Sequence, residues 1–234
     1  DILKYMSMDP IHRKWHHNLL TFSMTYAFAE NYILPISHDE VVHGKCSLIE
    51  KMPGDYNEKF ANLRTFYAYM MGHPGKKLLF MGGEFGQFSE WDFRKSLNWN
   101  LLDYDMHYRL HTYVRDLNFF YLNNNCLWEV DYSWEGFKWI DPHNYSQSII
   151  SFIRYSKDHE SSMIIVCNFT PVSYSDYRIG VPEPGKYVEV FNSDEEKYGG
   201  TGCKNVGFVK SDDVCWHNFP YSIRINIPPL AALF

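Results

Sequence analysis

The sequence lacks the cysteine spacing of a metal site or a disulfide framework. Its 234 residues include five cysteines, an odd number, and no two of them form a C-x-x-C pair. Structural zinc sites and disulfide scaffolds usually depend on such pairs or on an even count. We therefore expect reduced thiols in a cytoplasmic protein, without a disulfide framework or a structural zinc site.

Long apolar runs and an excess of positive charge are also missing. No stretch approaches the roughly 20 apolar residues of a membrane span, and the opening DILKYMSMDP has neither a signal-peptide core nor an initiating methionine. We expect a chain that begins within a longer one. The net charge of -6, without a basic block, argues against nucleic acid and membranes as partners.

The first half of the chain alternates helical and strand patterns. Spacings of three and four predict an amphipathic helix over residues 10–29, and NYILPIS (31–37) predicts a short buried strand. A second helix is predicted from residue 57 to Gly72, followed by a strand and a glycine-rich turn over 76–86. A third helix is expected to begin at Asp103 or Asp105. This order implies parallel strands with crossover helices.

The pattern changes near residue 125, which divides the chain in two. From about residue 135, short alternating runs such as SIISFIRYS, MIIVCNF, KYVEVFN and SIRINIP are separated by turn residues. Such runs predict an antiparallel sheet arranged as a sandwich. The expected fold class is therefore α/β over residues 1–124, followed by an all-β domain over 125–234.

The stretch PISHDEVVHGK (35–45) combines two histidines with adjacent carboxylates. His38 and His43 are five positions apart, which does not fit the H-E-x-x-H spacing of a zinc helix. Asp39 and Glu40 directly follow a predicted parallel strand, and Glu84 follows the next one. Active sites of α/β sheets and barrels lie beyond these strand ends. The pattern by itself fits a site for a polyhydroxylated substrate and a solvated loop equally well.

The stretch LPISHDEVVHGK resembles a segment of the bacterial glycogen (1,4-α-glucan) branching enzymes of the α-amylase superfamily. The likeness continues in DPIHRKWHHN, TFSMTYAFAENY, KLLFMGGEFGQFSEWD and SLNWNLLD, and again in NSDEEKYGG and PPLAALF. The resemblance implies the C-terminal part of a (β/α)8 TIM-type barrel followed by a β-sandwich. The implied reaction transfers part of an α-1,4-glucan such as glycogen or amylose to a 6-hydroxyl, without a metal or cofactor.

The same resemblance implies roles for individual residues. Asp39 would stabilise the transition state as a third carboxylate, and His38 would hydrogen-bond the same sugar ring. Substrate-binding roles are predicted for Glu40, His43, Lys45, Glu84 and Trp91, although His43 and Lys45 fit loop ordering equally well. For Trp91, shielding of the barrel rim is an equal alternative to sugar stacking.

The nucleophile and the acid that such a transfer requires have no matching motif before Pro35. A pairing of Asp39 with Glu84 is a minor alternative. We therefore predict an enzyme portion that is inactive alone. A glucan-binding module using Trp134, Trp139 or Trp216, or a structural module, remains the alternative. A partial barrel with exposed strand edges is also expected to self-associate.

Overall fold

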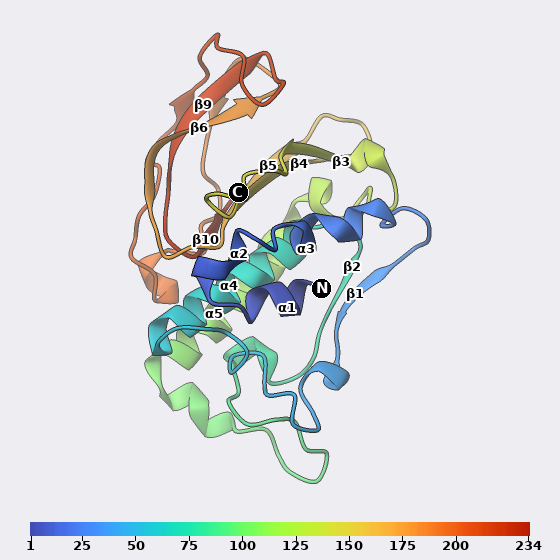
Figure 1. The fold of residues 1–234 in the computed structure, drawn as a ribbon, viewed down its shortest axis with the longest axis vertical. Coiled ribbons are helices and arrows are strands. Elements are labelled where there is room, and N and C mark those ends of the chain that lie inside the picture. Colours follow the sequence, from blue (N-terminus) through green and yellow to red (C-terminus); the bar gives the residue numbers. More distant parts are fainter.

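The computed structural model describes residues 1–234 and contains five α-helices and ten β-strands (Figure 1). The helices are α1 (Ile2–Met6), α2 (Pro10–Arg13), α3 (Asn18–Thr21), α4 (Tyr56–Gly72) and α5 (Asp105–Asn123). The strands are β1 (Ile33–Ile36), β2 (Lys76–Leu79), β3 (Phe137–Asp141), β4 (Ile149–Tyr155), β5 (Ser162–Asn168), β6 (Tyr174–Val181), β7 (Lys186–Tyr187), β8 (Val209–Lys210), β9 (Tyr221–Ile227) and β10 (Ala231–Leu233).

The predicted parallel strand pair is confirmed. β1 and β2 pair in parallel, from Ile33 opposite Lys76 to Ile36 opposite Leu79, and α4 is the crossover between them. The expectation of a buried strand is wrong for β1, because Ile33 is 55% exposed and only Ile36 is fully buried. The sheet has only these two strands. These residues therefore form no closed barrel.

The predicted helix over residues 10–29 is not continuous. The segment breaks into α2, α3 and a 3-10 turn at Phe22–Thr25. The side chains of the predicted apolar face are mostly exposed, and Trp15 is 64% exposed. Instead, Arg13 is fully buried and donates to the carbonyl oxygens of Met6 and Phe169 at 2.8 and 2.7 Å. The bond to Phe169 connects this segment to backbone 156 residues away.

The two long helices form as predicted. Asp55 begins α4 with a capping box, in which its side chain accepts from the Glu58 amide at 2.9 Å and Glu58 accepts from the Asp55 amide. Nearly every residue of α4 from Phe60 onward is buried, so this helix is central rather than amphipathic. In α5, which begins at Asp105, the apolar side chains of Leu110, Val114 and Leu117 are buried.

The C-terminal part is antiparallel, as predicted. β10, β5, β4 and β3 form one sheet in that order, and β6 pairs with β9 in a second sheet. β7 and β8 form a short separate pair, so the predicted run KYVEVFN is a strand only at its first two residues. Apolar side chains from both larger sheets meet in a second hydrophobic cluster, which fits a β-sandwich.

The largest hydrophobic core is continuous across the predicted boundary at residue 125. It joins α1, α4 and α5 to aromatic side chains of the β part, including Phe152, Phe169 and Phe234. Figure 1 shows α4 and α5 lying beneath the four-stranded sheet, between it and the loops that follow β1 and β2. The α/β and all-β parts therefore share one core.

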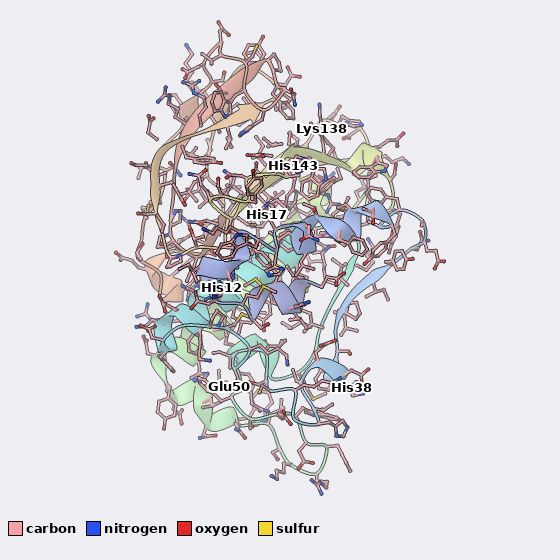
Figure 2. All side chains as sticks on the ribbon, viewed as in Figure 1. His12, His17, His38, Glu50, Lys138 and His143 are labelled. Atoms are coloured by element: carbon pink, nitrogen blue, oxygen red, sulfur yellow. The ribbon has the colours of Figure 1, made fainter.

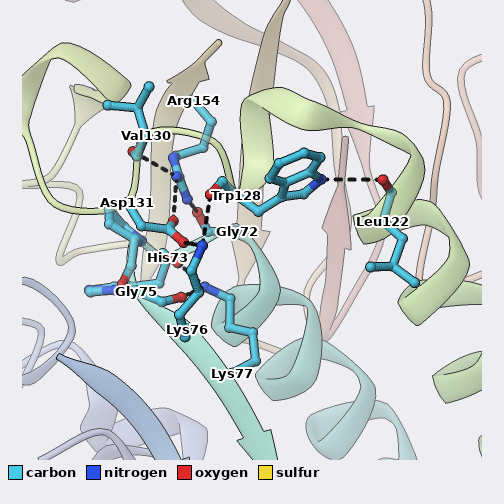
Figure 3. A network of polar contacts seen from close by, with 11 residues as sticks. Gly72, His73, Gly75, Lys76, Lys77, Leu122, Trp128, Val130, Asp131 and Arg154 are labelled. Atoms are coloured by element: carbon cyan, nitrogen blue, oxygen red, sulfur yellow. Dashed lines mark hydrogen bonds and ion pairs between the residues drawn. The ribbon is translucent and has the colours of Figure 1, made fainter. Parts of the chain in front are cut away.

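A buried ionic network crosses the same junction (Figure 3). The Arg154 guanidinium on β4 is inaccessible to solvent and donates to Asp131 Oδ1 at 2.8 Å. It also donates to the carbonyls of Gly72 and Gly136 at 2.9 and 3.0 Å. Lys76 on β2 binds the other Asp131 oxygen at 2.9 Å. Burial acts to raise the pKa of Asp131, but the cations around it hold that pKa below its usual value.

The buried side chain of His17 is expected to make the stability of the fold sensitive to acid. Its ring is 5% exposed, and neither nitrogen has a hydrogen-bond partner. Burial lowers its pKa to about 4, although the Asp141 carboxylate acts in the opposite direction. In the unfolded chain the pKa of this histidine is near 6.5, so between about pH 4 and 6.5 the unfolded state binds a proton that the folded state does not bind. Stability is therefore complete above about pH 6.5 and falls as the pH drops toward 4.

The two pKa values imply that His17 lowers the free energy of unfolding by about 2 kcal/mol between pH 8 and pH 5. We expect this part of the acid loss to be absent in His17→Leu. Urea unfolding at both pH values measures this difference. His12→Leu, which removes an exposed imidazole nearby, is the control (Figure 2). An unchanged acid loss in His17→Leu would contradict the prediction.

Candidate functional site

The candidate site lies where β1 and β2 end. Because the strands are parallel, their carboxyl ends meet at one edge, and the Phe80 amide extends the pairing by donating to the Ile36 carbonyl at 2.9 Å. A 3-10 turn, His38–Glu40, follows β1, and another, Gly83–Phe85, follows β2. Gly82 precedes the second turn with a φ of 89°, a conformation that favours glycine.

Three of the predicted residues come together at this edge. His38 Nε2 lies 3.2 Å from Asp39 Oδ1, and the Asp39 side chain is 71% exposed. The His38 ring centroid is 5.9 Å from that of Trp91 and 5.9 Å from that of Phe80. Phe80 and Trp91 themselves meet edge to face at 5.1 Å. The His38 imidazole therefore packs against two aromatic rings, and the Asp39 carboxylate beside it is exposed.

The loop after Asp39 is held by a residue that the sequence reasoning missed. Glu90 accepts hydrogen bonds from the amides of Gly44 and Cys46, at 3.0 and 2.7 Å. These backbone bonds lower the pKa of Glu90, so its carboxylate stays ionised at neutral pH. The one sequence feature that could have indicated Glu90 is its place beside Trp91 in SEWD. No local pattern connects it to residues 44 and 46.

Lys45 also orders this loop. Its ammonium donates to the Asp39 carbonyl oxygen at 2.7 Å, whereas the side chains of Glu40 and His43 make no hydrogen bond. Glu40 is half-buried and His43 is exposed, with a positive φ of 57°. Lys45 therefore has the loop-ordering contact that was one of its two expected roles, and Glu40 and His43 have no internal partner.

Glu84 stands apart from Asp39 in its contacts. Its half-buried side chain makes no hydrogen bond, whereas the nearby Glu90 binds two backbone amides. Its neighbour is Tyr67, whose hydroxyl donates to the Gly83 carbonyl at 2.8 Å. Burial, aided by the Glu84 charge, raises the pKa of Tyr67. No contact pairs Glu84 with Asp39.

The site is an open surface rather than an enclosed pocket. The cavity between the two loops, bounded by Val41, Phe80 and Trp91 among others, has a volume of only about 20 Å³. A space of that size holds about one water molecule. Figure 2 shows His38 at the end of the molecule where these loops lie, away from His12 and His17. A ligand there would lie across the surface.

Other candidate ligand groups are separate from this edge. No cluster of three or more His, Cys, Asp or Glu side chains is arranged to hold a metal ion. No helix is long and apolar enough to cross a bilayer. Trp139 packs against Phe137 at 4.7 Å and Phe152 at 5.8 Å, whereas Trp134 and Trp216 are exposed.

Comparison with known proteins agrees with this arrangement. Residues 139–234 match the family model "Alpha amylase, C-terminal all-beta domain". The crystal structure of an α-amylase from H. orenii matches with a TM-score of 0.56 and 14% sequence identity. The match covers 99% of this chain and 46% of the α-amylase chain. At that identity the likeness concerns the fold alone.

Sequence relatives are much closer. The chain is 64% identical over its full length to the 1,4-alpha-glucan branching enzyme GlgB of Halothermothrix orenii, and 53% identical to that of Aquifex aeolicus. It spans 37% of the length of each of these relatives. The chain therefore belongs to the 1,4-alpha-glucan branching enzyme family, within the α-amylase superfamily, and corresponds to its C-terminal portion.

Proposed function

We propose that this chain supplies part of the active site of a branching enzyme, which transfers α-1,4-linked glucan to a 6-hydroxyl. The observation that carries the proposal is the exposed His38–Asp39 pair at the carboxyl end of β1, supported by Trp91. The full-length similarity to branching enzymes supports the substrate class. Five free cysteines fit the proposed cytoplasmic location.

Asp39 acts on the sugar at the transition state. Retaining glycosyl transfer passes through an oxocarbenium-like ring between a nucleophilic carboxylate and a carboxylic acid. A third carboxylate at Asp39 accepts hydrogen bonds from ring hydroxyls, and these strengthen as the ring flattens. Its negative charge also raises the pKa of a nearby acid and keeps it protonated. No metal or organic cofactor takes part in this chemistry.

The neighbouring residues position the substrate. His38 donates to the same sugar ring, and its contact with Asp39 orients both groups. Trp91 offers an apolar face to the C–H surface of a glucose unit, as aromatic rings do for apolar groups. Glu40, His43 and Glu84, whose side chains have no internal hydrogen-bond partner, bind hydroxyls farther along the glucan, and Lys45 orders the loop beside them.

Residues 1–124 form the last strands and helices of a (β/α)8 barrel in this proposal, and residues 125–234 form its C-terminal domain. The parallel β1–α4–β2 unit and the likeness to an α-amylase fold support this assignment. The exposed side chains of Ile33 and Leu78 are where further strands and their covering layers would pack. The nucleophile and the acid come from outside these residues.

The proposal predicts that the chain is inactive alone and contributes to activity when it is joined to the rest of a branching enzyme. We expect no branching of amylose by the 234 residues alone, because one of three carboxylates cannot complete the transfer. A chimera in which this chain replaces the matching 37% of the H. orenii enzyme is expected to branch amylose at a rate close to that of the parent. Debranching of the product and chain-length analysis measure the new linkages.

Two results would contradict this prediction: branching by the isolated chain, or a folded chimera with no activity. In the second case a non-catalytic glucan-binding or structural role becomes the better assignment. The exposed side chains of Trp134 and Trp216 favour that alternative. It predicts amylose binding by the chain that survives Asp39→Ala and is lost in Trp134→Ala. Sedimentation velocity of the same samples tests the expected self-association.

A further inference from the structure

A cleft outside the candidate site lies between the two sheets of the C-terminal part. It has a volume of about 350 Å³, and 12 of its 16 lining residues are hydrophobic. Its walls come from β5 and β10 on one side and from β6 and β9 on the other, with the β7–β8 pair along its edge. It continues the smaller hydrophobic cluster between the sheets.

The wall of this cleft is aliphatic. Ile164, Ile179, Ile223 and Leu233 line it, and two valines at its mouth, Val188 and Val190, are 57% and 54% exposed. Ligand pockets typically have volumes of 300–1,000 Å³ and mostly apolar walls with a few polar groups. At about 30 Å³ for each water-sized group, this cleft holds on the order of ten non-hydrogen atoms. These dimensions suit one short hydrocarbon chain rather than a glucan.

The polar groups of the lining define the other end of the ligand. Glu189 accepts from Asn192 Nδ2 at 2.9 Å and from Asn205 Nδ2 at 2.8 Å, so both of its oxygens are engaged. Lys186 forms no ion pair, and its ammonium lies 4.2 Å from the centre of the Phe208 ring. An unpaired ammonium at the rim of an apolar cleft complements a negatively charged head group.

We propose that this cleft binds a single-chain anionic amphiphile, such as a medium-chain alkyl carboxylate, with its chain between the sheets and its head beside Lys186. Burial of each methylene group is expected to tighten binding about fourfold, from about 0.8 kcal/mol per group. The gain ends when the cleft is full. The affinity of a series of alkyl carboxylates therefore rises steeply with length and then levels off near ten carbon atoms.

Isothermal titration calorimetry with hexanoate, octanoate, decanoate and dodecanoate, each below its micelle concentration, tests the proposal. We expect one saturable site per chain and the length dependence just described. Lys186→Gln is expected to weaken decanoate about threefold to fivefold and to leave decanol unchanged. Val188→Asp, at the mouth, is expected to weaken decanoate about tenfold.

Val206→Asp is the matched control, because Val206 is 80% exposed and does not line the cleft. All of these substitutions are at exposed positions, and circular dichroism checks that the fold is retained. Absence of a saturable site, an affinity independent of chain length, or equal losses in Val188→Asp and Val206→Asp would each overturn the proposal. Binding to anionic phospholipid vesicles without binding of monomeric decanoate would also overturn it, and would assign the cleft to a bilayer surface.

Discussion

Replacing Arg154 with methionine is expected to lower the free energy of unfolding by about 3–5 kcal/mol, the usual result of breaking one side of a buried ion pair. The guanidinium has no solvent access and makes four hydrogen bonds, to Asp131 and to the carbonyls of Gly72, Val130 and Gly136. Its loss leaves these carbonyls unsatisfied and leaves Asp131 with Lys76 as its remaining ion-pair partner. The junction between α4 and the sheet should weaken most.

Urea unfolding at pH 7 measures this effect. The control is Arg115→Met, which breaks an exposed pair with Asp116 and is expected to cost less than about 1 kcal/mol. The double variant Arg154→Met/Asp131→Asn should lose less than the sum of the single variants, because the second change removes a charge that is already poorly paired. Equal losses in Arg154→Met and Arg115→Met would refute the structural importance of the network.

Replacing Asp39 with asparagine in the chimera is expected to lower kcat by a factor on the order of 10²–10³, as for loss of a charged transition-state contact. KM should change little, because this contact strengthens only as the sugar ring flattens. The folded state should be unaffected, since the side chain is 71% exposed and its one polar contact is His38.

Initial branching rates on amylose, together with the thermal midpoint of each variant, separate these effects. Asp103→Asn, which changes an exposed carboxylate at the end of the 3-10 turn Trp99–Asp103, is the control and should retain the parental rate. A rate for Asp39→Asn within threefold of the parent would remove Asp39 from the proposed mechanism. A large loss of thermal stability would instead assign the residue a structural role.

Local sequence patterns determined the regular elements that carry their own signals. The apolar residues spaced three and four apart after residue 57, with Gly72 at the end, predicted α4 without reference to the rest of the chain. The runs at β4, β5 and β9 are strands for a similarly local reason, since each is a short run rich in β-branched and aromatic residues and bounded by turn residues. The motif around Asp39 similarly identified the family, because it is a continuous stretch of sequence.

Tertiary contacts decided the features that link distant segments. Periodicity predicted a continuous helix around Trp15. In the structure α2 ends at Arg13, whose buried side chain donates to the Phe169 carbonyl, 156 residues away. Glu90 orders the loop at Gly44 and Cys46 across more than 40 positions, which no local pattern encodes. Loops at strand ends have few local constraints, so their partners appear only when the strands are paired.

The sequence alone therefore determined the family, the class of each half and the place of Asp39 at a strand end. Only the tertiary structure decided that the halves share one core, that Arg154 and Asp131 join them, and that Trp91 packs against the His38 ring beside Asp39. Helices and strands follow periods of 3.6 and 2 residues and can be read locally. Buried charges and loop contacts depend on which surfaces meet, and that is set by packing of the whole chain.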